Sequence, residues 1–240
     1  MPQMDIPILY EDDNLMVLNK PAGLIIHSDG KTKEPTLADW ILDKYPNIKD
    51  VGEPGRNAKG EIVHRPGIVH RLDRETSGVM IIAKNQKSFE NLKKQFQNRE
   101  VEKIYHAFVA GEMKDERGTI ERPIGRSGKD FRQWSAQRGA RGEMREAITD
   151  YRVITKSKGC SFVEISPRTG RTHQIRVHFK AINYPLVGDS LYAPKYKNML
   201  EFKRLALHSR QIIFKDLESK QHMIKAPYPV DFQRALEIIG

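Results

Sequence analysis

Short apolar runs alternate with turn-rich polar stretches along the chain, and their spacing predicts several strands. Two apolar runs between residues 8 and 19 flank the polar stretch 11–14, which indicates a β-hairpin. The continuous apolar run 79–83 predicts a buried strand. Alternating apolar positions over 105–109 predict another strand, which ends before Gly111. We predict further strands over 148–154, 162–165, 205–207 and 212–214.

Capping residues and apolar positions at helical spacing predict helices between these strands. Thr36 is the candidate N-cap of the first helix, which Pro46 ends. Apolar residues at helical spacing predict a second helix over 88–99, with Asn85 near its start. Residues 49–67 are rich in Gly, Pro and charge, which predicts a loop. The last two helices are predicted after Thr172, with Ile175, Phe179 and Ile182 on one side, and over residues 231–239.

Strands and helices in this order predict an α+β fold. No internal repeat or linker divides the 240 residues, so we expect one domain over 1–240 with a mixed, largely antiparallel central sheet flanked by helices and loops. No apolar run approaches the ~20 residues that a membrane helix needs. The N-terminus lacks the pattern of a signal peptide. Cys160 is the only cysteine, so no intramolecular disulfide can form, and we expect a cytoplasmic protein.

The charge balance points to a polyanionic partner. Lys and Arg outnumber Asp and Glu by 41 to 31, which gives a net charge of +10, and such an excess favours nucleic acid. Residues 122–145 interleave basic side chains with the aromatic residues Phe131 and Trp134, a composition that suits phosphates and unstacked bases. A solvated loop is the alternative. The basic residues of this segment include Arg126, Lys129, Arg132, Arg138 and Arg141.

Asp73 is the candidate catalytic carboxylate. It lies between Arg71 and Arg74, just before the apolar strand at 79–83. Neighbouring cations lower the pKa of a carboxylate, and a nucleophile or base must be ionised at neutral pH. A structural ion pair would show the same local pattern, so the residues alone leave both interpretations open.

Motifs along nearly the whole chain resemble the RluA-type family of RNA pseudouridine synthases. The most specific is RPGIVHRLD at 65–73, which continues through TSG at 76–78 to AK at 83–84. Chance agreement of so many motifs in one order is far rarer than that of any single motif. The others are ILYED at 8–12, VLNKPAGL at 17–24, KIYHA at 103–107, TGRTHQIRVH at 169–178, VGD at 187–189, LH at 207–208 and AP at 226–227.

The resemblance implies an isomerase that converts uridine in RNA to pseudouridine without a cofactor. Asp73 matches the essential aspartate that attacks the target nucleoside. Tyr105 matches the residue that stacks on the uracil and is a candidate for removing the proton from its carbon 5. Arg176 matches the basic residue that pairs with the aspartate. Arg71 would contact the RNA around the extruded base.

The expected substrate is a uridine of 23S-type ribosomal RNA or of transfer RNA. A uridine inside an RNA helix must be flipped out to react. Freed uracil must then be retained by an apolar pocket, for which Leu72 and Ile175 are candidates. Arg126, Arg132 and Trp134 are the candidate RNA contacts of the 122–145 segment. Relatives of this family often carry an N-terminal RNA-binding domain, which we do not expect here. The 183–185 segment reads Asn-Tyr-Pro where relatives show Gly-His-Pro.

Two rival functions make different demands on the sequence. A non-catalytic RNA-binding or ribosome-assembly protein needs the basic surface but not Asp73, Tyr105 and Arg176 together, although an enzyme could also act as an RNA chaperone. A metal-dependent nuclease needs clustered carboxylates, which the sequence does not show. His173 and His178 would point about 140° apart on a helix, so we expect no metal site. We also expect no membrane association, and a monomer.

Overall fold

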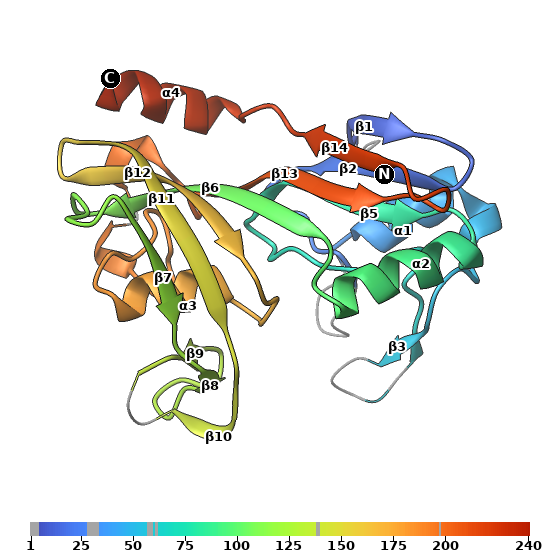
Figure 1. The fold of residues 1–240 in the computed structure, drawn as a ribbon, viewed down its shortest axis with the longest axis horizontal. Helices are drawn as coiled ribbons and strands as arrows, with labels where there is room; N and C mark the ends of the chain where they lie inside the picture. The colour runs from blue at the N-terminus through green and yellow to red at the C-terminus, as the bar shows by residue number, and fades with distance from the viewer. Residues whose placement is uncertain (1–4, 28–33, 57–59, 61, 138–139, 197) are drawn as a thin grey trace. The chain divides into compact units, whose positions relative to one another are not determined.

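The computed structural model describes residues 5–27, 34–56, 60, 62–137, 140–196 and 198–240. The chain divides into two compact units (Figure 1). Unit 1 holds the residues up to Glu102 together with Gln211–Pro227, and unit 2 holds Lys103–Arg210 together with Tyr228–Gly240. No helix in the part of the chain that the structure describes is long and apolar enough to cross a membrane.

The sheet of unit 1 is built around the predicted N-terminal hairpin. Strands β1 (Ile8–Glu11) and β2 (Leu15–Lys20) pair antiparallel, and β2 pairs antiparallel with β5 (Ser77–Ala83). All residues of β5 are buried, as its unbroken apolar run predicts. Beyond β5 lie β13 (Leu207–Lys215), which belongs to this unit from Gln211 onward, and its antiparallel partner β14 (Gln221–Lys225).

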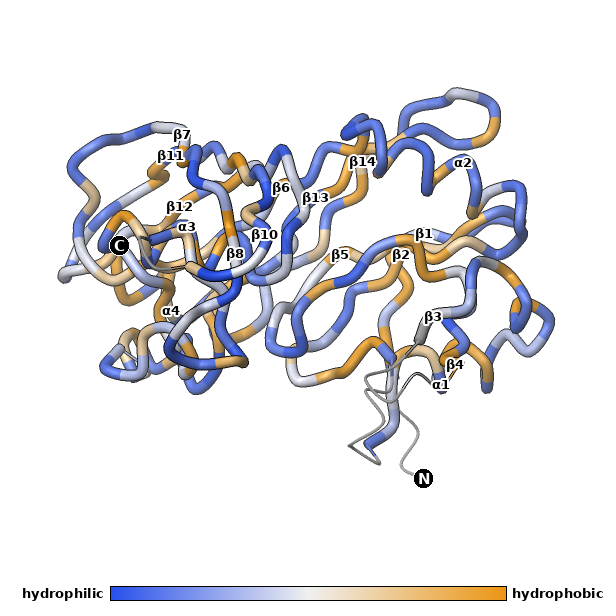
Figure 2. The backbone as a smooth tube through the Cα atoms, turned by 90° about the horizontal axis from the view of Figure 1, so that it is seen from below, coloured by the Kyte–Doolittle hydropathy of each residue, from blue (hydrophilic) through white to orange (hydrophobic). Residues whose placement is uncertain are grey.

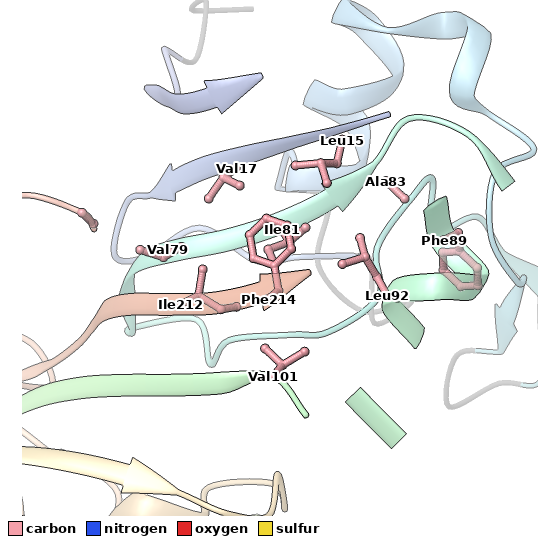
Figure 3. Close-up of a cluster of buried hydrophobic side chains, with 11 residues drawn as sticks. Leu15, Val17, Val79, Ile81, Ala83, Phe89, Leu92, Val101, Ile212 and Phe214 are labelled. Atoms are coloured by element: carbon pink, nitrogen blue, oxygen red, sulfur yellow. The ribbon is translucent and has the colours of Figure 1, made fainter. Parts of the chain in front are cut away.

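Helices α1 (Leu37–Lys44) and α2 (Gln86–Gln97) of unit 1 begin where the sequence places their caps. Thr36 forms a capping box with Asp39, and the Asn85 side chain accepts a hydrogen bond from the backbone of Ser88. Figure 3 shows side chains from β2, β5, β13 and α2 converging in one apolar cluster. Burying each large apolar side chain contributes about 1.5–3 kcal/mol. The cluster includes Leu15, Val17, Val79, Ile81, Leu92, Val101, Ile212 and Phe214.

The predicted loop over 49–67 is only partly a loop. It follows a 3-10 turn, Pro46–Ile48, and it contains the two short antiparallel strands β3 (Gly55–Arg56) and β4 (Ile62–Val63). Strands this short carry too few apolar residues to produce a periodic pattern, so the sequence could not reveal them.

The sheet of unit 2 is antiparallel, in the order β6-β12-β11-β7. Its strands are β6 (Glu102–Ala110), β7 (Arg117–Glu121), β11 (Ile148–Ser157) and β12 (Cys160–Pro167). Successive residues of β6 point to opposite faces. Ala107 and Val109 pack with helix α3 (Gln174–Ala181), whereas Phe108 and Ala110 pack with helix α4 (Val230–Ile239). The two helices therefore cover opposite faces of this sheet (Figure 1).

Helix α3 starts one residue later than predicted, and its cap differs. The N-cap is His173 rather than Thr172, and it adopts a left-handed conformation with φ 57° and no side-chain cap. The Gln174 side chain instead accepts a hydrogen bond from the backbone of Arg171, at 3.0 Å, which supports the turn before the helix. Ile182 is the C-cap and not part of the helix. Two 3-10 turns, Pro194–Tyr196 and Met199–Glu201, follow.

The basic 122–145 segment contains a small sheet, so it is only partly a loop. Strands β8 (Ile124–Arg126), β9 (Trp134–Ser135) and β10 (Arg141–Arg145) pair antiparallel in the order β10-β8-β9. Arg138 lies outside the described residues. Figure 2 shows how apolar residues follow the core strands such as β5, while polar residues line the connecting segments.

Candidate active site

The loop that carries Asp73 is anchored on both sides of the carboxylate. Leu72 and Thr76 are buried, at 4% and 2% exposure, whereas Asp73 is half-buried and Arg71 is exposed. The backbone of Thr76 donates to the Asp73 carbonyl at 3.1 Å, which closes a turn immediately before β5 begins at Ser77. The aspartate is thus held at the start of the most buried strand of unit 1.

A fully buried lysine fixes the far side of this turn. Lys20, at the end of β2, has 0% exposure, and its ammonium donates to three backbone carbonyls. They belong to Pro21 at 2.8 Å, Leu24 at 2.9 Å and Arg74 at 3.0 Å. A buried charge is tolerated only when such partners replace water. Because Arg74 follows Asp73 directly, Lys20 restrains the backbone that presents the carboxylate.

The residues before Asp73 are fixed by contacts with β5 and α2. The His70 ring nitrogen Nε2 accepts a hydrogen bond from the Ile81 backbone at 2.9 Å, and the ring stacks on Phe96 with centroids 4.7 Å apart. Gly67 adopts φ 65°, and a Cβ there would lie 2.0 Å from the Ala83 carbonyl oxygen. Only glycine fits this close approach, which explains the glycine of the RPGIVHRLD motif.

The arginines around Asp73 have different surroundings. Arg74 pairs with Glu34 at 2.7 Å and with Glu75 at 3.8 Å, and all three side chains are about half-exposed, so these pairs add little stability. Burial and then the charge of Arg71 hold the pKa of the Arg65 guanidinium below its ordinary value. Arg71 and Arg65 therefore add positive charge near this loop, which suits a phosphate-bearing substrate.

Tyr105 and Ile175 lie on the same face of the unit 2 sheet. Tyr105 is opposite Ile165 in the β6–β12 ladder, and its half-buried ring packs against the apolar cluster that contains Ile175 and Phe179 of α3. Ile175 is 7% exposed. Arg176 follows Ile175 directly on the helix. The structure thus brings together three of the predicted site residues, Tyr105, Ile175 and Arg176, on the α3 side of the sheet.

Arg176 is held by a buried carboxylate that the sequence analysis did not assign to the site. Its guanidinium makes a bidentate ion pair with Asp189, with bonds of 2.7 and 2.8 Å, and the two side chains are 11% and 1% exposed. The guanidinium also lies over the Tyr192 ring, 4.8 Å from the centroid. The only sequence signal for Asp189 was the VGD motif, which names no partner.

The small basic sheet pairs its charges with its aromatic residues. The Arg126 guanidinium stacks over the Trp134 ring at 4.1 Å, so this face of the half-buried indole is covered. Phe131, at 83% exposure, is the most exposed large apolar side chain among the described residues. The exposed Arg132 forms a bidentate pair with Asp130, whose side chain is partly buried. The ring of Phe131 is therefore more exposed than that of Trp134, the aromatic residue that the sequence analysis named as a candidate RNA contact.

The two histidines considered as metal ligands have structural partners. His173 contacts the Tyr192 hydroxyl at 2.9 Å. His178 is buried; its Nε2 donates to the Arg122 carbonyl at 2.9 Å, and its Nδ1 accepts from the Thr149 hydroxyl at 2.9 Å. Burial lowers the pKa of His178, which favours this neutral form.

The predicted site residues are divided between the units. Asp73, Arg71 and Leu72 belong to unit 1, and the others belong to unit 2. Three anchoring residues escaped the sequence analysis, namely Lys20, Asp189 and Tyr192. Lys20 stands in the VLNKPAGL motif, which indicates no role for it, and its burial depends on contacts that no local pattern shows.

Comparison with known proteins assigns this fold to one class. The solved structure of the human RNA pseudouridylate synthase domain containing 4 is 26% identical, with a TM-score of 0.71 over 96% of this chain and 91% of that one. The sequence model of the RNA pseudouridylate synthase family matches residues 14–181, a range that includes Asp73, Tyr105 and Arg176. The chain therefore belongs to this family, whose members are isomerases that convert uridine to pseudouridine in RNA.

Two bacterial relatives give the extent of the similarity. An uncharacterized RNA pseudouridine synthase of Chlorobaculum parvum is 40% identical over 98% of this chain and 75% of its own length. The ribosomal large subunit pseudouridine synthase D of Pseudomonas aeruginosa is 34% identical over 98% of this chain and 72% of its own length. The family resemblance and the α+β fold expected from the sequence are both confirmed.

Proposed function

We propose that the protein isomerises specific uridines of ribosomal or transfer RNA, with Asp73 as the attacking carboxylate. The anchored loop around Asp73 supports this proposal most directly. Lys20 and Thr76 fix the backbone on one side of the carboxylate, and His70 fixes it on the other. Holding a reacting group in place removes part of the entropic barrier, and the loop does this before any substrate binds.

The proposed reaction leaves the composition of the uridine unchanged, because a proton gained at nitrogen 1 replaces the hydrogen lost from carbon 5. The Asp73 carboxylate attacks the target nucleoside, either at the ribose or at the uracil ring, and the glycosidic carbon–nitrogen bond breaks. The uracil turns while held, and its carbon 5 bonds to the ribose. A proton then leaves carbon 5, with Tyr105 as its candidate acceptor, and the aspartate is released. Arg176 is the basic residue proposed to pair with the Asp73 carboxylate.

The freed uracil must be held through this turn. Stacking on Tyr105 and contact with Leu72 and Ile175 are the proposed means. The partial burial of the Tyr105 ring supports this role, because a ring that packs on one side against a fixed cluster has little freedom to move. A closed apolar site also keeps water from the reacting carbons.

Extruding the uridine from an RNA helix costs a few kcal/mol, which contacts with the rest of the RNA must offset. Arg71 beside the catalytic loop, together with Arg126 and Arg132 on the small sheet, are the proposed phosphate contacts. Phe131 and Trp134 are the proposed base contacts, with the exposed ring of Phe131 favoured. Binding should weaken steeply with salt, because phosphate contacts release counterions.

The substrate class is tested with unmodified ribosomal and transfer RNA transcripts that carry tritium at carbon 5 of uridine. Isomerisation at this carbon releases the label to water. The name of the Pseudomonas relative favours large-subunit ribosomal RNA as the first transcript to try. Release from one RNA class by the wild type identifies the substrate. No release from any RNA, by a folded protein that still binds RNA, would favour a non-catalytic RNA-binding protein instead.

A further inference from the structure

Tyr192 lies between the small basic sheet and Arg176. Its hydroxyl accepts a hydrogen bond from the Trp134 backbone at 2.9 Å and contacts Nδ1 of His173 at 2.9 Å. The hydroxyl thus has two partners, the Trp134 backbone and the His173 ring. The guanidinium of Arg176 lies over the Tyr192 ring, 4.8 Å from the ring centroid. The Lys180 ammonium lies 5.4 Å from the same centroid. One buried side chain thus contacts both the proposed RNA-binding sheet and a proposed catalytic residue.

A second contact ties the same sheet to the chain just before Tyr192. The side chain of Gln133 donates to the Leu191 carbonyl at 2.8 Å. Gln133 directly precedes β9, so residues 133–134 are joined to residues 191–192 by two hydrogen bonds. Ile124 of β8 and Val177 of α3 also share an apolar cluster with Tyr192. The small sheet is therefore held by side-chain contacts with residues 191–192 as well as by its chain connections.

Asp189 completes the link from this segment to Arg176. Besides its ion pair with Arg176, Oδ1 of Asp189 accepts from the backbones of Leu191 and Tyr192 at 3.0 and 2.9 Å. The preceding Gly188 adopts φ 72°, and a Cβ there would lie 1.8 Å from the Arg204 carbonyl oxygen. The backbone from Gly188 to Tyr192 is consequently held in one shape.

We propose that Asp189 and Tyr192 are positioning residues that join the RNA-binding sheet to Arg176. This inference rests on the proposed function, because it takes the small sheet as an RNA contact and Arg176 as part of the catalytic site. Tyr192 sets the place of the sheet through its hydroxyl, and Asp189 sets the direction of the Arg176 guanidinium through its charge. The two roles are separable, because different atoms perform them.

Two substitutions separate the roles by their effects on KM and kcat. Tyr192→Phe keeps the ring below Arg176 but removes the hydroxyl, so it should raise KM for RNA about three- to tenfold, the effect of one lost hydrogen bond, and change kcat less than about twofold. Asp189→Asn keeps the shape but removes the charge, so it should lower kcat at least about tenfold and change KM less than about threefold.

The chain offers matched controls in the same unit. Asp231 makes the same bidentate pair with Arg204, at 2.6 and 2.9 Å, and that guanidinium also lies over an aromatic ring. Tyr228 likewise contacts a histidine, His106, at 2.6 Å, with Arg210 over its ring at 4.5 Å. Asp231→Asn and Tyr228→Phe should leave kcat and KM within about twofold of the wild type, since their partners are not tied to the small sheet.

A binding readout makes the inference testable apart from the reaction. The chain has two tryptophans, so Trp40→Phe leaves Trp134 as the sole indole, and its fluorescence reports RNA binding at the small sheet. In this background, Tyr192→Phe should raise the RNA concentration at half-saturation about three- to tenfold, while Tyr228→Phe should not. If the wild type binds RNA with this fluorescence response but releases no tritium, the proposed function is refuted. The titration of Tyr192→Phe against Tyr228→Phe would still test the role of Tyr192 in binding.

The inference is overturned if Tyr192→Phe binds RNA like Tyr228→Phe in the fluorescence titration. It is also overturned if Asp189→Asn and Asp231→Asn change kcat equally, because Asp189 would then act only through stability. A folded Asp189→Asn variant with a low kcat and an unchanged KM, beside a folded Tyr192→Phe variant with the opposite pattern, supports it.

Discussion

Replacing Lys20 with methionine tests whether the buried ammonium holds the loop that carries Asp73. Methionine keeps most of the apolar stem of lysine and removes its three hydrogen bonds to carbonyls. The Arg74 carbonyl keeps a second bond, from the Gly23 backbone at 2.9 Å, so the main loss falls on the carbonyls of Pro21 and Leu24. A buried carbonyl that loses its partner costs about 1–3 kcal/mol.

Two such carbonyls give an expected loss of at most about 2–6 kcal/mol in the free energy of unfolding, and the exposure of Pro21 reduces its share. Relief from burying an ammonium offsets part of this loss, so the lower half of the range is expected. Urea denaturation measures the free energy. Lys84→Met is the matched control, because Lys84 also bonds a backbone carbonyl, that of Asp12 at 2.6 Å, but lies nearer the surface.

The control should lose no more than about 1 kcal/mol. Equal losses in the two variants would refute the argument, because they would show that the burial of Lys20 adds nothing. A loss below about 1 kcal/mol for Lys20→Met would do the same. The folded fraction of Lys20→Met should also show a reduced kcat, since the turn at Asp73 loses its support.

Three further substitutions or treatments test local features. Gly67→Ala should lower the free energy of unfolding by about 3 kcal/mol or more in urea denaturation, because its Cβ would lie 2.0 Å from a carbonyl oxygen. The control Gly23→Ala, whose Cβ would have nothing within 4 Å, should lower it by only about 1–2 kcal/mol, the cost of a left-handed backbone. Burial lowers the pKa of His178 in the folded state, so the unfolded state gains a proton first as the pH falls; the free energy of unfolding should therefore decline below pH ~6.5, and less steeply in His178→Gln. Burial raises the pKa of the Cys160 thiol to about 11, so a thiol reagent at pH ~8 should label the denatured protein and leave the folded one unlabelled.

The parts of the fold that were predictable carry long periodic patterns or strong caps. The β1–β2 hairpin, the buried strand β5 and the caps Thr36 and Asn85 follow from the local sequence. The missed elements are short or depend on distant partners. Strands β3, β4, β8 and β9 span two or three residues each, which is too few to show a period. The N-cap of α3 is His173 and not Thr172, and its ring contacts the hydroxyl of Tyr192, 19 residues away, which the local sequence does not show.

In the candidate site, too, some residues could be predicted from local motifs, whereas the roles of others depend on distant contacts. Asp73, Tyr105 and Arg176 could be proposed because motifs carry them, and the structure places the latter two on one face of a sheet. Lys20 and Asp189, which hold neighbouring parts of the site, also lie in motifs, but nothing in those motifs indicates their partners. A lysine is usually exposed, and the burial of Lys20 depends on carbonyls from two distant segments, Pro21–Leu24 and Arg74. Composition also does not show that Arg126 covers Trp134 while Phe131 is exposed, because this depends on packing.

Release of tritium by the Asp73→Asn variant is the most direct test of the proposed chemistry. The wild type, Asp73→Asn and Glu75→Gln would be compared on the RNA class that the wild type modifies, under single-turnover conditions and at saturating protein. Glu75→Gln is the matched control, because it removes a second carboxylate from the same loop. We predict release by the wild type and by Glu75→Gln, and none by Asp73→Asn, although this variant still binds the RNA. Equal release by all three proteins would remove Asp73 from the reaction and contradict the account.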